Sequence, residues 1–161
     1  FETGAGGSAP KHVQQLVEEG HLRWDSLGEF CALGESLNFV AESIGNSKAG
    51  LLGKAVDAAT QLLLANDKSP SRGVGEADTR DSHYYFALYW AQALGAQTED
   101  QDLADDFAEL AAALAYNEKT ITAELASTQG KPCDLGGYYH PASDKVALVM
   151  RPSATLNSII G

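Results

Sequence analysis

Apolar residues recur at helical spacing along most of this chain, and that period constrains its fold more than any other feature. Phe30, Leu33 and Leu37, for example, lie three or four positions apart, so they share one face of a helix. Asparagine, serine and glycine residues stand where successive helices would begin or end. The sequence predicts helices at about 10–19, from 25 or 26 onward, from 46 or 47 onward, and at 83–94, 101–115, 117–128, 142–150 and 151–159.

Two groups of side chains give expectations about the core. The aromatic residues within 83–94 are expected to pack in the interior rather than to form a cofactor site. Cys31 follows Phe30 on an apolar helical face, so a buried free thiol is expected there. The other cysteine, Cys133, is far away in the sequence and no CxxC pair occurs, which argues against a zinc or redox motif. Free thiols fit a reducing cytoplasm.

The charge balance excludes some classes of partner. The formal net charge is −11, so nucleic acid and anionic membrane surfaces are not expected as partners. No apolar run approaches the roughly 18 residues of a membrane span, and no signal peptide is visible. With 161 residues the chain can bury a core of its own, as one domain or a large part of one. Because it lacks an initiator Met, we expect a processed or truncated product.

A glycine-rich segment, Phe1-Glu2-Thr3-Gly4-Ala5-Gly6-Gly7-Ser8-Ala9-Pro10, opens the chain and is predicted to be a loop that leads into the first helix. Ser8 would cap that helix and Pro10 suits its first position. Lys11 and His12 would then lie in the first turn, where backbone N–H groups favour an anion such as phosphate. The plainer alternative is a serine-capped turn formed for local reasons alone.

Seven collinear segments carry a resemblance that covers the whole chain. They are FETGAGGSAPKHVQQ (1–15), HLRWDSLGEF (21–30), KSPSR (68–72), ALYWAQAL with AQTED (87–100), QGKP (129–132), DLGGYYHP (134–141) and MRPSATLN (150–157). On these segments the chain resembles the C-terminal portion of the monomeric-type NADP-dependent isocitrate dehydrogenases. The Gly-Ser-Ala-Pro core is also similar to the adenosine-binding loop of the wider β-decarboxylating dehydrogenase group.

This resemblance implies a fold and a division of the chain. The fold would be mainly α with a few short strands, as the C-terminal portion of the α/β cofactor-binding domain of an isocitrate or isopropylmalate dehydrogenase. Residues 1–161 would form a single NADP-binding domain or the C-terminal part of one. Within it, residues 1–25 would supply the glycine-rich loop and first helix, residues 66–80 the phosphate-site loop, and residues 134–161 the tail.

The resemblance also implies which residues hold the adenosine and 2′-phosphate end of NADP. Arginine binds phosphate oxygens through two parallel N–H groups, so Arg23 and Arg72 would favour NADP over NAD. Asp25 would orient Arg23 or bind a ribose hydroxyl. The full set implied for the cofactor is Gly7, Ser8, His12, Arg23, Trp24, Asp25 and Arg72. Lys11 and Lys68 are expected to add positive charge around this site.

The implied reaction is the oxidative decarboxylation of isocitrate to 2-oxoglutarate in the tricarboxylic acid cycle, with Mg²⁺ or Mn²⁺. The metal and isocitrate ligands would come from segments upstream, so this chain alone would bind NADP without catalysis. Two alternatives stay open: a stand-alone NADP-binding regulatory or interaction module, and a structural domain that has lost the cofactor. Self-association of the isolated segment through bare apolar faces also stays open.

Two residues depart from the resembled pattern. The family usually has Lys where this chain has Gly73, and Gly where it has Asp81. The loop region thereby loses one positive charge and gains one negative charge. Exposed charges of this kind alter binding by about 1 kcal/mol or less. We therefore expect weakened affinity for NADP rather than lost specificity, with Arg72 providing most of the discrimination.

Overall fold

The computed structural model describes the backbone of residues 4–161 and the side chains of residues 10–161. Over residues 4–161 the chain forms eight helices and no strand. The expectation of a few short strands within an α/β fold is therefore wrong for this part of the molecule. The helices are α1 (Gly4–Glu19), α2 (Leu27–Ile44), α3 (Ser47–Ala65), α4 (Thr79–Ala96), α5 (Gln101–Tyr116), α6 (Glu118–Ala126), α7 (Ser143–Met150) and α8 (Ala154–Ile160).

Local chemistry explains why the tail forms no strand. Gly136 and Gly137 have φ angles of 79° and 155°, which lie outside the β region, and the nearby Pro141 has no N–H to donate to a ladder. The apolar residues that follow are spaced for a helix and form α7. The sequence of residues 136–141 favours a turn or a short strand, and in the structure these residues form bends and no strand.

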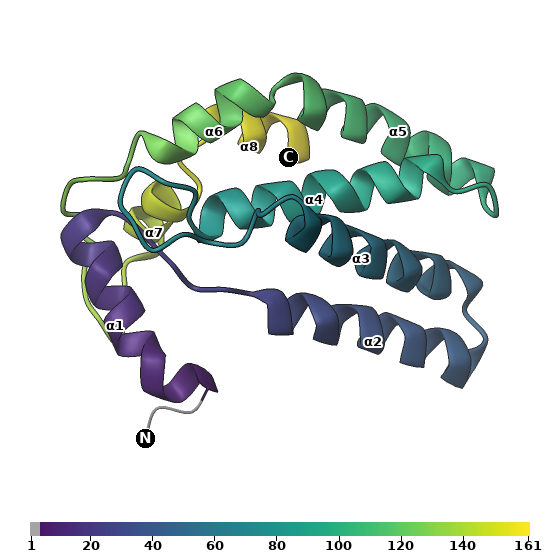
Figure 1. Ribbon diagram of the computed structural model, residues 1–161, viewed down its shortest axis with the longest axis horizontal. Helices are drawn as coiled ribbons and strands as arrows, with labels where there is room; N and C mark the ends of the chain where they lie inside the picture. Colours follow the sequence, from purple (N-terminus) through teal and green to yellow (C-terminus); the bar gives the residue numbers. More distant parts are fainter. Residues whose placement is uncertain (1–3) are drawn as a thin grey trace.

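Four long helices, α2 to α5, run back and forth and pack in a row, each against the next in sequence (Figure 1). Neighbouring helices are antiparallel: short connections join α2 to α3 and α4 to α5, and the longer loop of residues 66–78 joins α3 to α4. Small residues allow close approach: a Cβ added at Gly95 of α4 would lie 3.1 Å from the Cα of Ala108 in α5. The row places α4 between α3 and α5, so most faces of α4 are covered.

The core follows from this arrangement and confirms the aromatic expectation. Tyr84, Tyr85 and Phe86 of α4 are buried, and Phe86 stacks on Phe30 of α2 with ring centroids 3.9 Å apart. The expectation for Cys31 is wrong: its thiol is exposed, because Phe30 takes the inward position and the next residue points about 100° away around the helix.

Over residues 4–161, no helix has both the length and the apolar character that crossing a membrane requires.

Most helix boundaries agree with the sequence to within about two residues, but α4 begins at Thr79 rather than at 83, and the start of the chain also differs. The side chain of Asn46 caps α3 by accepting from the Ala49 N–H, and residues 66–78 form an irregular loop, as expected. The first helix, however, begins at Gly4 rather than near residue 10, so Pro10 lies inside α1. Proline has a helical φ, but inside a helix it removes one hydrogen bond and crowds the carbonyl four residues earlier, so this extension back to Gly4 is not what Pro10 favours. The predicted glycine loop from residue 4 onward is therefore wrong, and Lys11 and His12 do not lie in a first turn.

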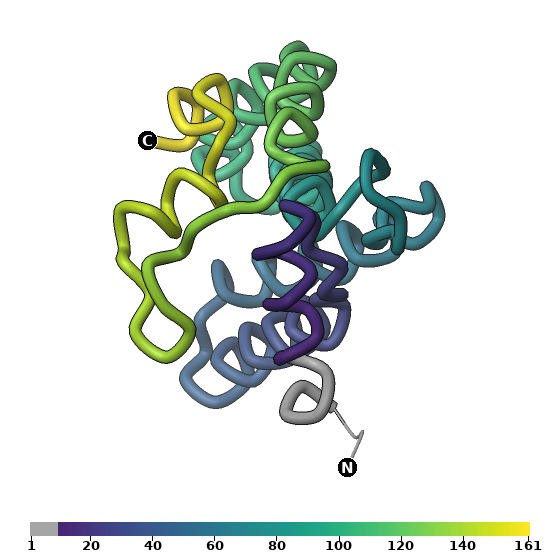
Figure 2. The backbone as a smooth tube through the Cα atoms, turned by 90° about the vertical axis from the view of Figure 1, so that its left-hand side faces the viewer, coloured from purple at the N-terminus to yellow at the C-terminus, as the bar shows by residue number. Residues whose placement is uncertain are grey.

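The C-terminal end of α1 is held against the segment that follows α6. The N–H of Gly130 donates to the carbonyl of Glu19, and the N–H of Cys133 donates to that of Val17. In Figure 2 this yellow-green segment passes the C-terminal end of α1 and then leads away from it. Gly20, with φ of 63°, ends the helix where an added Cβ would lie 2.3 Å from the Thr128 carbonyl oxygen. Three stretches far apart in sequence, α1, residues 20–26 and residues 127–133, thus meet at one end of the helical row.

Candidate functional site

A hollow of about 340 Å³ lies at this end of the molecule, and positively charged or titratable side chains line it. They come from three separate elements: His12 from α1, Arg23 from residues 20–26, and Arg72 from the loop between α3 and α4. Pro70 of the same loop completes the lining. The structure thus brings together three of the side chains singled out in the sequence, across 60 positions of the chain.

The guanidinium groups of the two arginines in this hollow have no protein partner among the described residues. Among the described residues, neither Arg23 nor Arg72 has its guanidinium in an ion pair or hydrogen bond. Within the part of the chain whose side chains are described, residues 10–161, no carboxylate lines the hollow. In a chain with a net charge of −11, two uncompensated guanidinium groups beside one imidazole form a local region of positive potential.

Trp24 contacts His12, one of the residues that line the hollow. The two rings meet edge to face, with centroids 5.3 Å apart and planes at 77°. Such pairs contribute roughly 0.5–1.5 kcal/mol beyond the area they bury, so this contact restrains the imidazole. Both side chains are half-buried.

The remaining sequence-derived residues lie elsewhere. The carboxylate of Asp25 accepts from the Leu27 N–H at 3.0 Å and so faces the start of α2, outside the lining of the hollow. The Lys68 ammonium lies 4.2 Å above the Tyr85 ring, also outside that lining. Lys11 is exposed on α1. Gly7 and Ser8 lie outside the residues whose side chains are described.

Backbone pairing fixes the segment that carries Arg23. The Thr79 N–H donates to the Leu22 carbonyl at 2.7 Å, and the Leu22 N–H donates to the carboxylate of Asp78 at 3.1 Å. The Thr79 hydroxyl also donates to the Leu22 and Trp24 carbonyls. The start of α4 therefore holds residues 22–24 as a neighbouring strand would, although no strand forms.

A buried ion pair that sequence reasoning missed lies beneath this junction. Arg80 donates to Asp78 at 2.6 Å, and both side chains are almost fully buried. The same guanidinium donates to the carbonyls of Gly20 and Val149 and to the Thr128 hydroxyl. It therefore connects the start of α4 to α7 and to the residues that directly follow α1 and α6. An Asp two positions before an Arg is too common a pattern to identify such a pair from sequence.

Asp81, one of the departures from the resembled pattern, has a structural partner. Its carboxylate accepts from the Asp78 N–H and closes a capping box at the start of α4. Burial raises the pKa of Asp81, and the nearby Asp78 carboxylate adds to that effect. Asp81 is buried in this cap and does not line the hollow. The negative charge it adds is therefore directed at the helix start and not at the two arginines.

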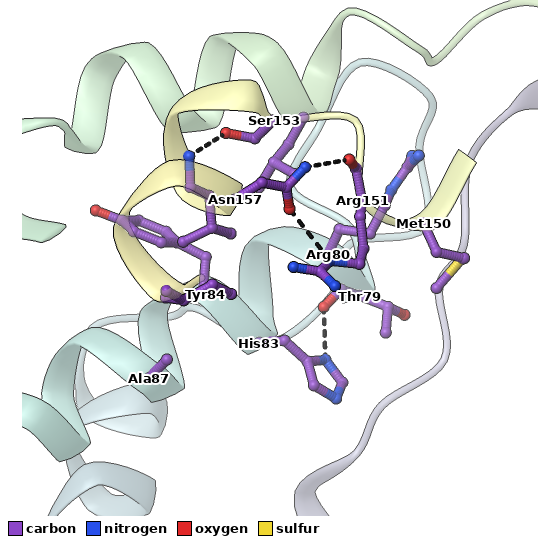
Figure 3. A pocket seen from close by; sticks show the side chains of 12 residues that line it. Thr79, Arg80, His83, Tyr84, Ala87, Met150, Arg151, Ser153 and Asn157 are labelled. Atoms are coloured by element: carbon purple, nitrogen blue, oxygen red, sulfur yellow. Dashed lines mark hydrogen bonds between the residues drawn. The ribbon is translucent and has the colours of Figure 1, made fainter. Parts of the chain in front are cut away.

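A second hollow, of about 280 Å³, lies between the start of α4 and the α7–α8 tail (Figure 3). Its polar groups bond to one another. His83 bonds to the Thr79 carbonyl, and Arg151 and Asn157 bond through both side chain and backbone. The rest of its lining is largely apolar, with Leu125, Leu156 and Ile160 among the residues. It lacks the pair of unpartnered guanidinium groups that sets the first hollow apart.

Within the described residues, no group of three or more His, Cys, Asp or Glu side chains is arranged to hold a metal ion. The fold and the hollow together define a helical domain with an open cationic site built from α1 and two loops. A family model for monomeric isocitrate dehydrogenase matches residues 1–161. The chain belongs to this family.

Individual relatives agree with the family match. The chain is 60% identical to isocitrate dehydrogenase [NADP] 2 of Mycobacterium tuberculosis and 58% identical to isocitrate dehydrogenase [NADP] of Azotobacter vinelandii. It is 56% identical to isocitrate dehydrogenase [NADP] 2 of Colwellia maris. Each match covers 99% of this chain and 22% of the relative. The chain thus spans about a fifth of the length of these relatives.

Proposed function

We propose that the cationic hollow binds the 2′-phosphate of NADP, with Arg23 and Arg72 as the principal phosphate ligands. The observation that carries this proposal is the meeting of His12, Arg23 and Arg72 in one hollow, which no carboxylate of residues 10–161 lines. A doubly charged phosphate monoester needs several N–H donors, and two guanidinium groups with an imidazole supply them. The names of the relatives, which include NADP, support the same ligand.

Within this proposal the other sequence-derived residues have supporting roles. Trp24 keeps the His12 ring in place through the edge-to-face contact. Asp25 shapes the turn after Arg23 through its bond to the Leu27 N–H and does not contact phosphate. Gly7 and Ser8 are proposed to contact the adenosine end of the cofactor, as the resemblance implies.

We assign the chain to the cofactor-binding part of an enzyme that oxidatively decarboxylates isocitrate to 2-oxoglutarate. Bound NADP supplies the hydride acceptor. The Mg²⁺ or Mn²⁺ ligands and the isocitrate carboxylate ligands are assigned to segments outside this chain. Cys31 and Cys133 are both free, which fits a cytoplasmic location for the complete enzyme.

Calorimetric titration of the 161-residue chain with NADP and with NAD tests the proposal. NADP should bind at least about tenfold more tightly, a difference of about 1.4 kcal/mol. Arg72→Ala should remove most of this preference and leave the helical content unchanged. Arg151→Ala is the matched control, because Arg151 is an exposed arginine outside the hollow. A preference that survives Arg72→Ala, or equal binding of both dinucleotides by the unmodified chain, would refute the assignment.

A further inference from the structure

The loop that carries Arg72 is held from outside by a single amide side chain. Gln129 lies in the QGKP segment after α6, and its Oε1 accepts from the Gly75 N–H at 2.7 Å. Its Nε2 donates to the carbonyl of Glu76 at 2.9 Å. Because one end of the amide accepts and the other donates, these two contacts fix its orientation. Gln129 therefore holds the backbone of two consecutive loop residues.

A buried histidine extends this connection to both arginine-bearing segments. His21 is fully buried, and its Nδ1 lies 2.9 Å from the Oε1 of Gln129. Its Nε2 lies 2.9 Å from the carbonyl oxygen of Ser71. His21 is two positions before Arg23, and Ser71 is the residue before Arg72. Both neighbours are acceptor oxygens, so an imidazole with one N–H donates to one of them and contacts the other, according to its tautomer. In either tautomer the ring lies between the segment that carries Arg23 and the loop that carries Arg72.

The loop is further held on both sides of Arg72. The Ser71 N–H donates to the Ala77 carbonyl at 2.8 Å, and the Gln15 amide donates to the carbonyl of Arg72 itself at 3.3 Å. The guanidinium of Arg72, by contrast, has no hydrogen bond among the described residues. Its position before a ligand arrives is therefore set by the backbone and not by its own contacts.

We propose that Gln129, acting with His21, is a positioning residue that determines the preference for a 2′-phosphate without touching it. This inference depends on the function proposed above. Binding through a mobile loop must also order that loop, and each side chain that becomes immobile weakens binding. The Gln129 amide orders residues 71–76 beforehand, so Arg72 meets the phosphate with less loss of freedom.

Two small ligands isolate the effect of the 2′-phosphate: adenosine 2′,5′-bisphosphate, which carries it, and adenosine 5′-monophosphate, which lacks it. The unmodified chain and its Gln129→Met variant are titrated with both. Methionine keeps the length of glutamine and removes its hydrogen bonds. The variant should bind the bisphosphate about tenfold more weakly, while its affinity for the monophosphate changes less than about twofold. Gln101→Met, on the exposed surface of α5, is the control and should change neither.

A double-mutant cycle separates positioning from a general structural role. If Gln129 acts through Arg72, then Gln129→Met should cause no further loss of bisphosphate affinity in the Arg72→Ala background. A Gln129→Ala variant measured in the same way guards against poor packing of methionine. The inference is overturned if these variants keep the normal ratio of the two affinities, or if the loss is equally large without Arg72. An unmodified chain that binds both ligands equally overturns the phosphate site itself, and this inference with it.

Discussion

Replacing Arg80 by methionine tests whether the buried ion pair with Asp78 holds the site end of the molecule together. The substitution keeps most of the apolar stem of the side chain and removes the guanidinium. It breaks the 2.6 Å bond to Asp78 and the bonds to Gly20, Thr128 and Val149. The carboxylate of Asp78 then stays fully buried, and its remaining donors are the backbone N–H groups of Leu22 and of position 80.

The size of the effect follows from the cost of leaving one charge of a buried pair uncompensated. Removing one partner of such a pair typically destabilises a protein by about 3–5 kcal/mol. For a chain of this length the midpoint of thermal unfolding moves by roughly 2–4 °C for each kcal/mol, so a fall of about 6–20 °C is expected. Lys54→Met gives the contrast. Lys54 and Glu99 form an exposed pair, and such pairs contribute about 1 kcal/mol or less.

Urea unfolding provides the measurement, followed by far-ultraviolet circular dichroism and by tryptophan fluorescence. Trp24 lies beside the hollow and Trp90 lies against the core, so coincident transitions would establish two-state unfolding. In the Asp78→Asn/Arg80→Met double variant the second change should cost at least about 1 kcal/mol less than it does alone. The reasoning is refuted if Arg80→Met costs no more than Lys54→Met, or if the two changes at the buried pair are additive.

Two further predictions concern acid stability and catalysis. Hydrogen bonds from Ser153 and then from Thr155 hold the pKa of Glu124 below its usual 4.5, so its contribution to stability is present above pH 4.5 and is lost as the pH falls through the lower, folded-state pKa. Urea unfolding between pH 6 and pH 3 should therefore show the advantage of the unmodified chain over Glu124→Gln shrinking toward acid, and a difference that is constant with pH would contradict this linkage. The 161-residue chain should show no isocitrate-dependent reduction of NADP at 340 nm with excess Mg²⁺ or Mn²⁺; measurable turnover would reveal a metal site that the described residues do not show.

The sequence predicted the helices well where local signals and packing agree. The Asn46 cap, the aromatic face of α4 and the irregular loop before it all depend on neighbouring residues, and local rules describe them. The start of α1 was wrong because Gly and Pro disfavour a helix interior, so local preference predicted a start near Pro10, whereas the helix extends back to Gly4. The strands were wrong because they were carried over from a whole domain to a segment that does not form them.

The sequence singled out cationic side chains that the structure brings together, but it did not indicate the residues that hold them in place. Arg23 and Arg72 were singled out because the resemblance and the demands of a phosphate ligand agree, and the structure brings both to one hollow. Gln129, His21 and Arg80 support these residues through contacts that span 50 or more positions. Nothing in the local sequence marks a glutamine that will bond a distant loop, so these residues emerge from the fold alone.

The distribution of charge along the molecule explains how a chain with a net charge of −11 can present a cationic hollow. The acidic residues around 99–106 lie at the turn between α4 and α5 and at the start of α5, whereas α1 and the loop before α4 lie at the opposite end (Figure 1). The 18-residue helix α4 separates the two ends, a length of about 27 Å. The Debye length at physiological ionic strength is about 8 Å, so this acidic run is strongly screened at the hollow. The acidic run at 99–106 therefore contributes little at Arg23 and Arg72, and this part of the negative charge does not argue against an anionic ligand there.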